Sequence, residues 1–414
     1  MEVKINMNKN DELAVCLLGT YVPQELFDDI QKRSKIKAAG SPVIMQRNIF
    51  RSMNEVCDDI TVFSYPPVAM FPKGIIVNKR QVVTINRDNT NHVFFMINIP
   101  ILKQAMLFFS FLFSLILWSH NKKQKKKIVF LYADFLEYCI PALILRRVCG
   151  YKTVLFLTEM PGYAHYKKGR RGIIDLIKIT YEHFKSELYE KYDGYIFVTK
   201  HMSDKVKLKH KPYTVIEGFV ENSIQSHSMI LKKSDEPKVA MYAGSLGAAY
   251  NIKMLVDAFQ MTKGQYELWI FGDGLDAEYV KEAASKDTRI KYFGRVPQQQ
   301  VLDAERRADL LLHVKTAEDE HSKYAFSSKI LEYMMTGIPV LTTVVAGIPD
   351  EYYEHLYIID ETTTAGISKA LINTLSLEPK ERFEKGKSAQ RFVVENKCFT
   401  VQGEKMLRLM REIV

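Results

Sequence analysis

A short polar segment opens one of the helices expected in the second half of the chain. Ser327 and Ser328, within FSSKILEYMMTGIPV (326–340), are good N-cap residues. Gly337 lies where such a helix would end, and Pro339 follows it. The spacing therefore predicts a short helix that begins at the two serines and ends at the glycine.

Two charged residues of this helix are not explained by helix formation. A capping box needs a glutamate three residues after the cap, whereas Glu332 comes four residues after Ser328. Lys329 lies in the first turn, where the helix dipole favours anions. A phosphate bound by the N–H groups of this turn would explain the lysine. The alternative is an exposed lysine and a surface glutamate, and these residues alone do not decide between the two.

The composition limits what kind of protein can position this segment. The chain has 414 residues, enough for two domains, and its 47% hydrophobic and 26% charged content is that of a folded globular enzyme. A formal net charge of +10 favours anionic partners such as nucleotides, phospholipid headgroups or nucleic acid. Five scattered cysteines without metal-binding spacing indicate a reducing, cytosolic setting, and no secretory signal precedes them.

Short apolar runs alternate with helical patterns along the whole chain, which predicts mainly parallel sheets covered by helices. The strands expected in the first half are 13–19, 60–68, 92–99, 127–133, 152–159, 194–200 and 213–221. Those expected in the second half are 238–246, 266–274, 289–297, 309–314 and 339–343.

This pattern predicts an α/β chain of two Rossmann-like domains that face each other across a cleft. The expected limits are an N-terminal domain over 1–222 and a C-terminal domain over 223–395. A final helix within 396–414 would pack back on the N-terminal domain. Ligands of such sheets bind beyond the carboxyl ends of the strands, where the polar loops lie.

One segment has the composition of a membrane-contacting helix. Residues 105–118 are apolar apart from two serines, but they are too few to cross a bilayer comfortably. The lysine-rich stretch NKKQKKK (121–127) follows directly. These residues are either a core helix followed by a solvated loop, or an interfacial helix beside a polybasic patch on an anionic membrane.

Four motifs of the second half resemble the nucleotide-sugar-binding domain of GT-B glycosyltransferases of family 4. They are YAGSLGAAYNIKMLVDAF, LWIFGDG, IKYFGRVPQQQVLDAERRADLLLHV and FSSKILEYMMTGIPVL, in the order that the family uses. The resemblance is strong over residues 238–345. The Phe-Ser-Ser-Lys form of the last motif looks like a subset found among bacterial capsule, exopolysaccharide and lipopolysaccharide transferases.

The resemblance implies a role for each part of the donor site. Glu332 would bind the ribose hydroxyls of the nucleotide, which a carboxylate can accept in pairs. The residues Gly294, Arg295 and Val296 would border the base. The diphosphate would lie at the helix start and beside the first glycine turn; the residues concerned are Ser327, Ser328, Lys329, Gly244 and Ser245. The family needs neither a cofactor nor a metal, because helix N–H groups and basic side chains take the charge of the leaving diphosphate.

The sequence departs from the family at three positions. Tyr324 stands where the family has the glutamate that contacts the donor sugar, and Glu318 in the preceding loop could replace it. Ser245 and Tyr250 stand where the family has an arginine and a lysine that hold the diphosphate. The phosphate charge would then fall to Lys329 and Lys315, and the identity of the sugar is left open.

The first half resembles the family less closely, as its acceptor-binding domains do, and the resemblance implies that role for residues 1–222. Gly19, after the first strand, could let backbone approach the diphosphate, and LTEMPGYAHY (157–166) resembles a segment of the same transferases at a strand end. Glu159 is the candidate catalytic base, and His165 is either a catalytic residue or an ordinary loop histidine. Basic residues that could meet a lipid-linked pyrophosphate or anionic headgroups follow: Lys167, Lys168, Arg170 and Arg171.

These observations predict a cytoplasmic glycosyltransferase that is peripheral on the inner face of the plasma membrane. It would move a sugar from a nucleotide diphosphate donor to a lipid-linked or surface-polysaccharide acceptor, and UDP is the nucleotide expected in the donor. The resemblance implies retention of the anomeric configuration. A sugar-nucleotide epimerase and a non-catalytic donor-binding partner subunit are the alternatives. Nucleic acid is not an expected partner, because the basic residues do not follow an aromatic-interleaved surface.

Overall fold

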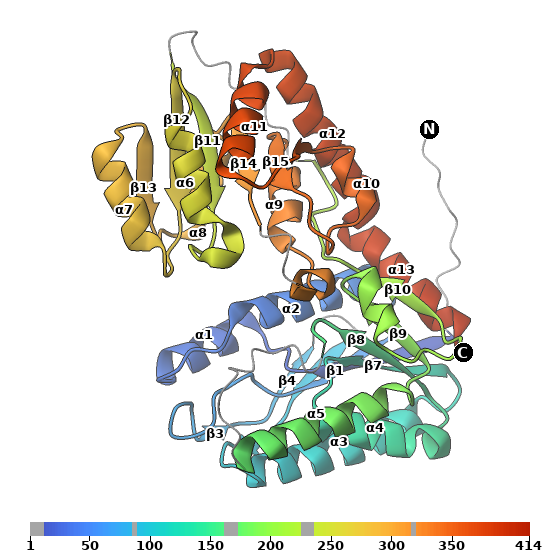
Figure 1. Ribbon diagram of the computed structural model, residues 1–414. Coiled ribbons are helices and arrows are strands. Elements are labelled where there is room, and N and C mark those ends of the chain that lie inside the picture. The colour runs from blue at the N-terminus through green and yellow to red at the C-terminus, as the bar shows by residue number, and fades with distance from the viewer. Residues whose placement is uncertain (1–11, 85–88, 161–172, 225–235, 316–319) are drawn as a thin grey trace. The chain divides into compact units, whose positions relative to one another are not determined.

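The computed structural model describes residues 12–84, 89–160, 173–224, 236–315 and 320–414 (Figure 1). The chain divides into two compact units, each described here by itself. The first contains Met1–Ile216 and Phe399–Val414, and the second contains Glu217–Cys398. The sequence had placed the corresponding limits at 222 and 395.

The first unit is built on an eight-stranded sheet with the order β10-β9-β8-β7-β1-β2-β5-β4. Only its edge strand β4 runs antiparallel to its neighbour. The strands are β1 (Leu13–Gly19), β2 (Ile60–Ser64), β4 (Gln81–Thr84), β5 (Thr90–Val93), β7 (Lys126–Tyr132), β8 (Lys152–Leu157), β9 (Gly194–Phe197) and β10 (Tyr213–Val215). The central strand β1 is buried throughout, as expected of a parallel strand covered on both faces.

One predicted strand of this unit is wrong. Residues 92–99 do not form a single strand, because the chain leaves the main sheet after β5. Its continuation, β6 (Met96–Ile97), pairs instead with β3 (Val77–Asn78) in a separate two-stranded sheet. Side-chain amides accompany this change of partner: Asn78 Nδ2 donates to Phe94 O, and Asn98 Nδ2 donates to Ala69 O and Ile75 O.

Helices cover both faces of the first sheet. In Figure 1, α3 and α4 lie on one face and α2 lies on the other. The helices are α1 (Gln24–Arg33), α2 (Gly40–Val56), α3 (Leu102–Asn121), α4 (Leu136–Cys149), α5 (Ile173–Tyr189), the 3₁₀ turn η1 (Lys200–Asp204) and α13 (Phe399–Glu412). The C-terminal helix α13 packs against α2, where Ser52 Oγ donates to Phe399 O at 2.6 Å. Gly403 allows this approach, since a Cβ there would lie 2.5 Å from Ser52 O.

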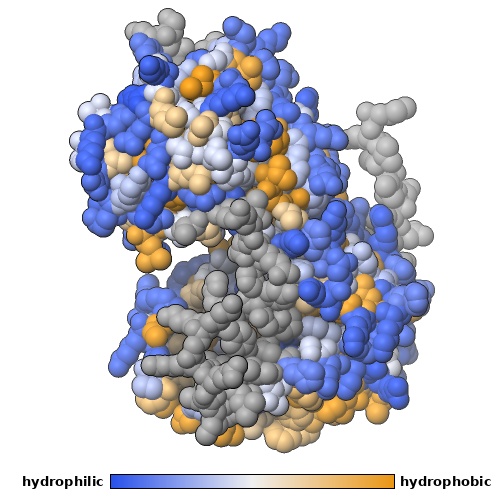
Figure 2. Space-filling view, in the orientation of Figure 1, coloured by the Kyte–Doolittle hydropathy of each residue, from blue (hydrophilic) through white to orange (hydrophobic). Residues whose placement is uncertain are grey.

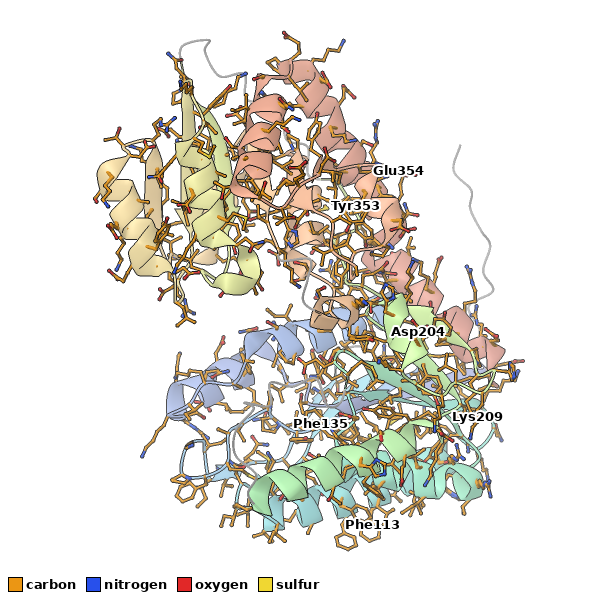
Figure 3. The ribbon with its side chains drawn as sticks, viewed as in Figure 1. Phe113, Phe135, Asp204, Lys209, Tyr353 and Glu354 are labelled. Atoms are coloured by element: carbon orange, nitrogen blue, oxygen red, sulfur yellow. The ribbon has the colours of Figure 1, made fainter. Side chains whose placement is uncertain are left out.

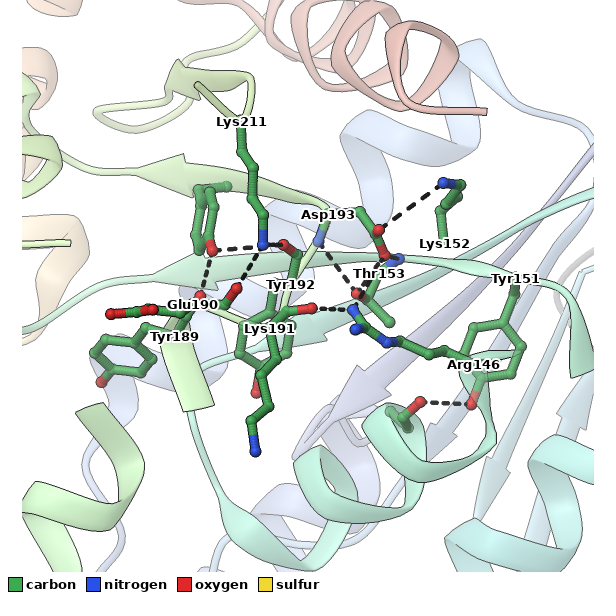
Figure 4. A network of polar contacts seen from close by, with 12 residues as sticks. Arg146, Tyr151, Lys152, Thr153, Tyr189, Glu190, Lys191, Tyr192, Asp193 and Lys211 are labelled. Atoms are coloured by element: carbon green, nitrogen blue, oxygen red, sulfur yellow. Dashed lines mark hydrogen bonds and ion pairs between the residues drawn. The ribbon is translucent and has the colours of Figure 1, made fainter. Parts of the chain in front are cut away.

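A polar network fixes the amino ends of β8 and β9 (Figure 4). Asp193 Oδ2 accepts hydrogen bonds from both the backbone N–H and the hydroxyl of Thr153, each at 2.9 Å. Arg146 and Lys152 lie 3.9 Å from the same carboxylate. Lys211 Nζ donates to the carbonyls of Glu190 and Tyr192. These charges hold the turn between α5 and β9, away from the strand ends at which ligands of such sheets bind.

The helix predicted over 105–118 is longer in the structure and has two unlike sides. α3 spans 20 residues and is long and apolar enough to cross a membrane by length and composition, yet a third of its apolar window is buried. Leu107, Phe111 and Leu115 are fully buried in the first unit. Phe113 and Leu117 on the other side are more than half exposed. The helix therefore belongs to the core along one side only.

The second unit is built on a six-stranded parallel sheet with the order β13-β12-β11-β14-β15-β16. The strands are β11 (Lys238–Ala243), β12 (Tyr266–Phe271), β13 (Ile290–Gly294), β14 (Leu310–His313), β15 (Val340–Thr343) and β16 (Tyr357–Ile359). The five strands expected from the sequence are confirmed, each ending a few residues before its predicted limit or at it.

The helices of this unit follow the strands in the expected alternation. They are η2 (Ala248–Tyr250), α6 (Ile252–Gln260), α7 (Ala277–Lys286), α8 (Gln298–Glu305), η3 (Glu320–Tyr324), α9 (Ser328–Thr336), α10 (Asp350–Tyr353), α11 (Thr364–Ser376) and α12 (Pro379–Lys397). The core lies between the sheet and helices α6, α7 and α11, where Leu255, Phe259 and Leu371 are fully buried. The connections at the carboxyl ends of β11, β12, β13 and β14 carry the motifs that the sequence singled out.

Candidate functional site

Helix α9 has the limits that its serines and glycine predicted. It runs from Ser328 to Thr336, with Ser327 at the N-cap and Gly337 at the C-cap with a φ of +74°. The expected capping by a serine side chain is wrong, because the Ser327 side chain makes no hydrogen bond to the N–H groups of the helix. Its hydroxyl instead pairs with Nε2 of His313 at 2.9 Å.

His313 joins the helix start to the sheet. It is the last residue of β14, and its Nδ1 pairs with Thr342 Oγ1 of β15 at 2.9 Å. Burial, together with the nearby Lys315 ammonium, lowers the pKa of His313 to about 3. The ring is therefore neutral at physiological pH, with one nitrogen donating and the other accepting. This residue holds the Ser327 hydroxyl away from the first turn of α9, and sequence reasoning did not find it.

Three glycine turns meet at the carboxyl ends of β11, β12 and β13. Gly272 has a φ of +128°, and a Cβ there would lie 1.8 Å from Gly244 O. Gly272 N also donates to Gly294 O at 2.8 Å. Only glycine permits such a close backbone approach at this conformation. The structure therefore brings together Gly244 and Gly294, which the sequence placed at the diphosphate and the base; Arg295 follows them exposed and Val296 partly buried.

Tyr333 fastens α9 to the first of these turns. Its hydroxyl accepts a hydrogen bond from Ala243 N at 2.9 Å and lies 3.2 Å from Ala243 O. Ala243 is the residue that precedes Gly244, so the helix that carries Lys329 and Glu332 is anchored beside the glycine turns. The predicted donor residues of the second unit thus share one region.

Lys329 and Glu332 contact each other in this structure. Lys329 Nζ lies 2.7 Å from Glu332 Oε2, and Glu332 is about half exposed. The ammonium also lies 5.2 Å from the centre of the Tyr333 ring. The carboxylate expected to bind the ribose and the ammonium expected to bind the diphosphate are therefore adjacent, and each is accessible to solvent.

A second carboxylate, which sequence reasoning missed, lies behind this pair. Glu305 at the end of α8 is 1% exposed, and its Oε1 lies 3.8 Å from Lys329 Nζ. Burial raises the pKa of Glu305 to about 7, while Lys329 opposes the rise and Glu332 adds to it. The sequence offered a signal for the burial of Glu305. Val301 lies one helical turn before it, and its neighbour Ala304 lies with Ala308 on the buried side of this segment.

The predicted sugar-binding residues are only partly described. Tyr324 ends η3 and is buried, close to the loop after β15, where a Cβ on Gly347 would lie 2.3 Å from Ala325 O. Glu318 lies outside the described residues.

Ser245, predicted to lie at the diphosphate, is exposed, and its carbonyl accepts a hydrogen bond from Tyr242 Oη at 2.7 Å.

The first unit carries the other predicted site residues. Glu159 is exposed just beyond the end of β8. Gly19 ends β1, and a Cβ there would lie 2.3 Å from Gln46 Oε1, which accepts a hydrogen bond from Thr20 N at 2.7 Å. Gln46 therefore explains the glycine, and binding of a diphosphate by Gly19 stays a prediction. The other predicted site residues lie outside the described part of the chain; they are His165, Lys167, Lys168, Arg170 and Arg171.

A pocket lies beside Gly19 in the same unit. The ends of β1 and β7 and the helix α2 line it, and Gln46 lies there among apolar residues such as Phe50 and Phe130.

Within the described part of the chain, no group of three or more His, Cys, Asp or Glu side chains is placed to hold a metal ion.

The chain is similar to known proteins in part of its sequence and in its fold. Residues 237–376 match the family described as glycosyl transferases group 1. Comparison with curated protein sequences gives no match. Many solved structures share the fold, and the three compared next each cover almost the whole chain.

The structure of OtsA without ligand is 10% identical, covers 97% of this chain and 100% of its own, and has a TM-score of 0.64. Anabaena HepE in complex with UDP is 14% identical, with 96% and 100% covered and a TM-score of 0.61. The lipopolysaccharide outer core galactosyltransferase WaaB is 15% identical, with 97% and 100% covered and a TM-score of 0.58.

These likenesses agree with the two parallel α/β units and with the order of the motifs in the second unit. The sequence match covers the β11–α11 region that holds Glu332, Lys329 and the glycine turns. The chain thus has the GT-B fold, residues 237–376 of its second unit are similar to glycosyl transferases group 1, and the chain is a glycosyltransferase.

Proposed function

We propose that this glycosyltransferase uses a UDP-sugar as donor and a lipid-linked or surface-polysaccharide glycan as acceptor. The observation that carries the donor assignment is the adjacent pair of Lys329 and Glu332 in the first half of α9, beside the turn at Gly244. Two of the similar structures, HepE with UDP and the E. coli trehalose-6-phosphate protein with UDP-2-fluoroglucose, contain uridine nucleotides.

The chemistry of the pair fits a nucleoside diphosphate. A carboxylate at Glu332 can accept both vicinal hydroxyls of a ribose, and it would release Lys329 as it does so. The free ammonium and the N–H groups that open α9 then provide positive charge for a diphosphate, because the Ser327 side chain does not cap them. This charge stabilises the diphosphate as it leaves the sugar, so no metal is required.

Transfer with retention of configuration is part of the proposal. The acceptor would bind at the strand ends of the first unit, where Glu159 is exposed and able to orient or deprotonate a hydroxyl. His165 is retained as a candidate for the same role. If the product were inverted, Glu159 would be the base.

A panel of nucleotide sugars tests the donor assignment. We expect UDP-sugars to raise the melting temperature of the parent and to be hydrolysed slowly, and Glu332→Ala and Lys329→Ala to lose most of both effects. Glu278→Ala is a matched control, because Glu278 is exposed on α7 and pairs with Lys281 in the same i, i+3 geometry. Equal stabilisation of the parent and both site variants would show that the proposed site is wrong. Binding without turnover would favour a donor-binding partner subunit.

The proposal includes peripheral attachment to the cytoplasmic face of a membrane. Exposed apolar side chains lie along α3 and continue onto α4; they are Leu102, Phe109, Phe113, Ile116, Leu117, Ile144 and Val148. Apolar residues gather at the lower edge of the first unit in Figure 2, and Phe113 points away from the sheet in Figure 3. One side of α3 is packed in the core, so this helix would lie in the membrane interface and would not span it.

The lysines after α3 contribute less to this surface than the sequence suggested. Lys122 and Lys125 donate to Asp59 at 2.7 and 2.8 Å, and Lys127 donates to Ser119 and Cys149. These contacts are internal, and Lys123 and Lys126 are the exposed members of the run. Attachment should therefore depend mainly on apolar contact, with a smaller contribution from anionic lipid.

Sedimentation with phosphatidylglycerol-containing vesicles tests the attachment. We expect the parent to bind, and the double variant Phe113→Ser/Leu117→Ser to lose most binding while its melting temperature is unchanged. Leu275→Ser is the control, since Leu275 is 97% exposed in the second unit. Equal vesicle binding by the double variant and the parent would contradict the role of α3.

A further inference from the structure

Glu305 is a buried carboxylate that lacks the usual partners of one. It is 1% exposed, and neither of its oxygens has a hydrogen-bond partner among the residues that the structure describes. An ionised carboxylate in such a place is strongly destabilised unless a counter-ion or a proton neutralises it. Its nearest cation is Lys329, whose Nζ lies 3.8 Å from Oε1.

That counter-ion is shared with the donor site. Lys329 makes its short contact with Glu332 at 2.7 Å and only a longer one with Glu305. A donor bound as proposed would place negative diphosphate charge at the same ammonium. Glu305 would then lose part of the attraction that favours its ionised form, to which Arg306 also contributes, and it would be repelled by the diphosphate.

We propose that Glu305 is a positioning residue that holds Lys329 in the empty site and takes up a proton from solvent when the diphosphate of the donor binds Lys329. The inference rests on the proposed donor site. The charges stay compensated in this exchange, because the Lys329 ammonium neutralises part of the diphosphate charge and a proton neutralises Glu305 in its place. Donor affinity should therefore fall as pH rises through neutrality.

Besides Lys329, the charges of Glu332 and Arg306 act on Glu305, and the ionisable side chains of Tyr333 and His313 interact with Glu305 and Lys329, respectively. Arg306, the residue that follows α8, carries a guanidinium that favours the ionised form of Glu305. Tyr333 stays neutral because burial raises the pKa of its phenol well above the ordinary value. His313 stays neutral because burial lowers the pKa of its ring to about 3. Burial places the pKa of Glu305 itself at about 7, within the range where the effect would be measured.

Calorimetric binding of UDP-glucose between pH 6 and 8.5 tests the proposal. UDP-glucose is suitable because its diphosphate diester has no ionisation in this range. We expect its Kd to rise by about fivefold from pH 7 to pH 8, within the tenfold per pH unit that uptake of one proton allows. Uridine, which has no diphosphate, should show no such rise.

Glu305→Gln resembles the protonated residue in shape and charge. Its Kd for UDP-glucose should be independent of pH and lower than that of the parent at pH 8. Asp303→Asn is the control on the same helix, since Asp303 is exposed and should leave the pH dependence of the parent unchanged. A retained slope in Glu305→Gln, or weaker binding by it at every pH, would overturn the proposal.

The parent alone provides a second measurement that does not depend on folding of a variant. Binding enthalpies in buffers of different ionisation enthalpy count the protons exchanged, and we expect net uptake at pH 7.5. A count of zero would overturn the proton exchange even if UDP-glucose binds. No binding of UDP-glucose at any pH would instead overturn the donor site itself.

Discussion

Two buried glutamates of the second unit each lie beside a lysine, yet the two pairs are built differently. Glu217 Oε1 accepts a hydrogen bond from Lys397 Nζ at 2.7 Å, and Lys397 is 3% exposed. Lys397 donates to Glu351 as well, also at 2.7 Å. Glu305 has Lys329 at 3.8 Å, and Lys329 is 29% exposed.

The difference lies in what each lysine is free to do. Lys397 ties the segment that enters the second unit to the one that leaves it, where Val220 N also donates to Lys397 O at 3.1 Å. Lys329 is held by an exposed glutamate and can exchange it for a ligand. The closed pair, Glu217 and Lys397, therefore stabilises the fold. The open pair, Glu305 and Lys329, leaves charge available for binding, at a cost in stability.

Breaking the closed pair should have the largest effect on stability. Lys397→Met leaves the buried Glu217 without its cation, and we expect the free energy of unfolding to fall by about 3 to 5 kcal/mol. Urea denaturation measures it. Lys380→Met, an exposed position on the same helix, should change it by less than about 0.5 kcal/mol. A loss as small as that of the control would mean that the pair does not hold the unit together.

Neutralising the carboxylate of the open pair should stabilise the protein, and only above acid pH. Burial raises the pKa of Glu305 from 4.5 to about 7. The folded state therefore keeps a proton that the unfolded state has lost between these values, and this stability is lost as pH rises through 7. Glu305→Gln should gain about 2 kcal/mol at pH 8 and almost nothing at pH 4.5. A gain equal at both values, measured by urea denaturation, would contradict the buried charge.

His313 should have a smaller effect of opposite sign. His313→Leu leaves the hydroxyls of Ser327 and Thr342 without this partner, and we expect a loss of about 1 to 2 kcal/mol at pH 7.5. Burial lowers the pKa of His313 to about 3, so the parent loses stability as pH falls below 6.5 because the unfolded chain is protonated first. The variant lacks this dependence, and the two should approach each other at pH 5. A constant difference between the two pH values would rule out a buried neutral ring.

The exposed contact between Lys329 and Glu332 should matter least for stability. Glu332→Ala removes a contact at the surface, and we expect a change below about 0.5 kcal/mol, whereas the same variant should lose donor binding. Thermal shift with and without UDP-sugar measures both quantities in one experiment. Substantial destabilisation without ligand would indicate that Glu332 is a structural residue.

Much of the second unit could be predicted from local sequence. The apolar, β-branched runs marked its strands, and Ser327 and Gly337 marked the limits of α9, because these choices depend on neighbouring residues. Lys329 and Glu332 could be singled out from local sequence as well, because helix formation alone explains neither residue. The single strand expected over 92–99 failed, because strand pairing depends on distant partners.

What each polar group contacts was decided by the tertiary structure. The sequence predicts that the lysines after α3 lie on the surface, yet Lys122 and Lys125 donate to Asp59, more than 60 residues earlier in the chain. The Ser327 side chain read as a cap, yet His313 holds it.

The sequence by itself determined the fold class, the family resemblance and the residue types of the donor site, since these follow from local pattern and composition. The burial of Glu305 at 3.8 Å from Lys329 was decided only by the tertiary structure, which brings the end of α8 to the first turn of α9. The physical reason is that burial and counter-ion distance depend on the whole fold, and they set which charges are fixed and which can exchange.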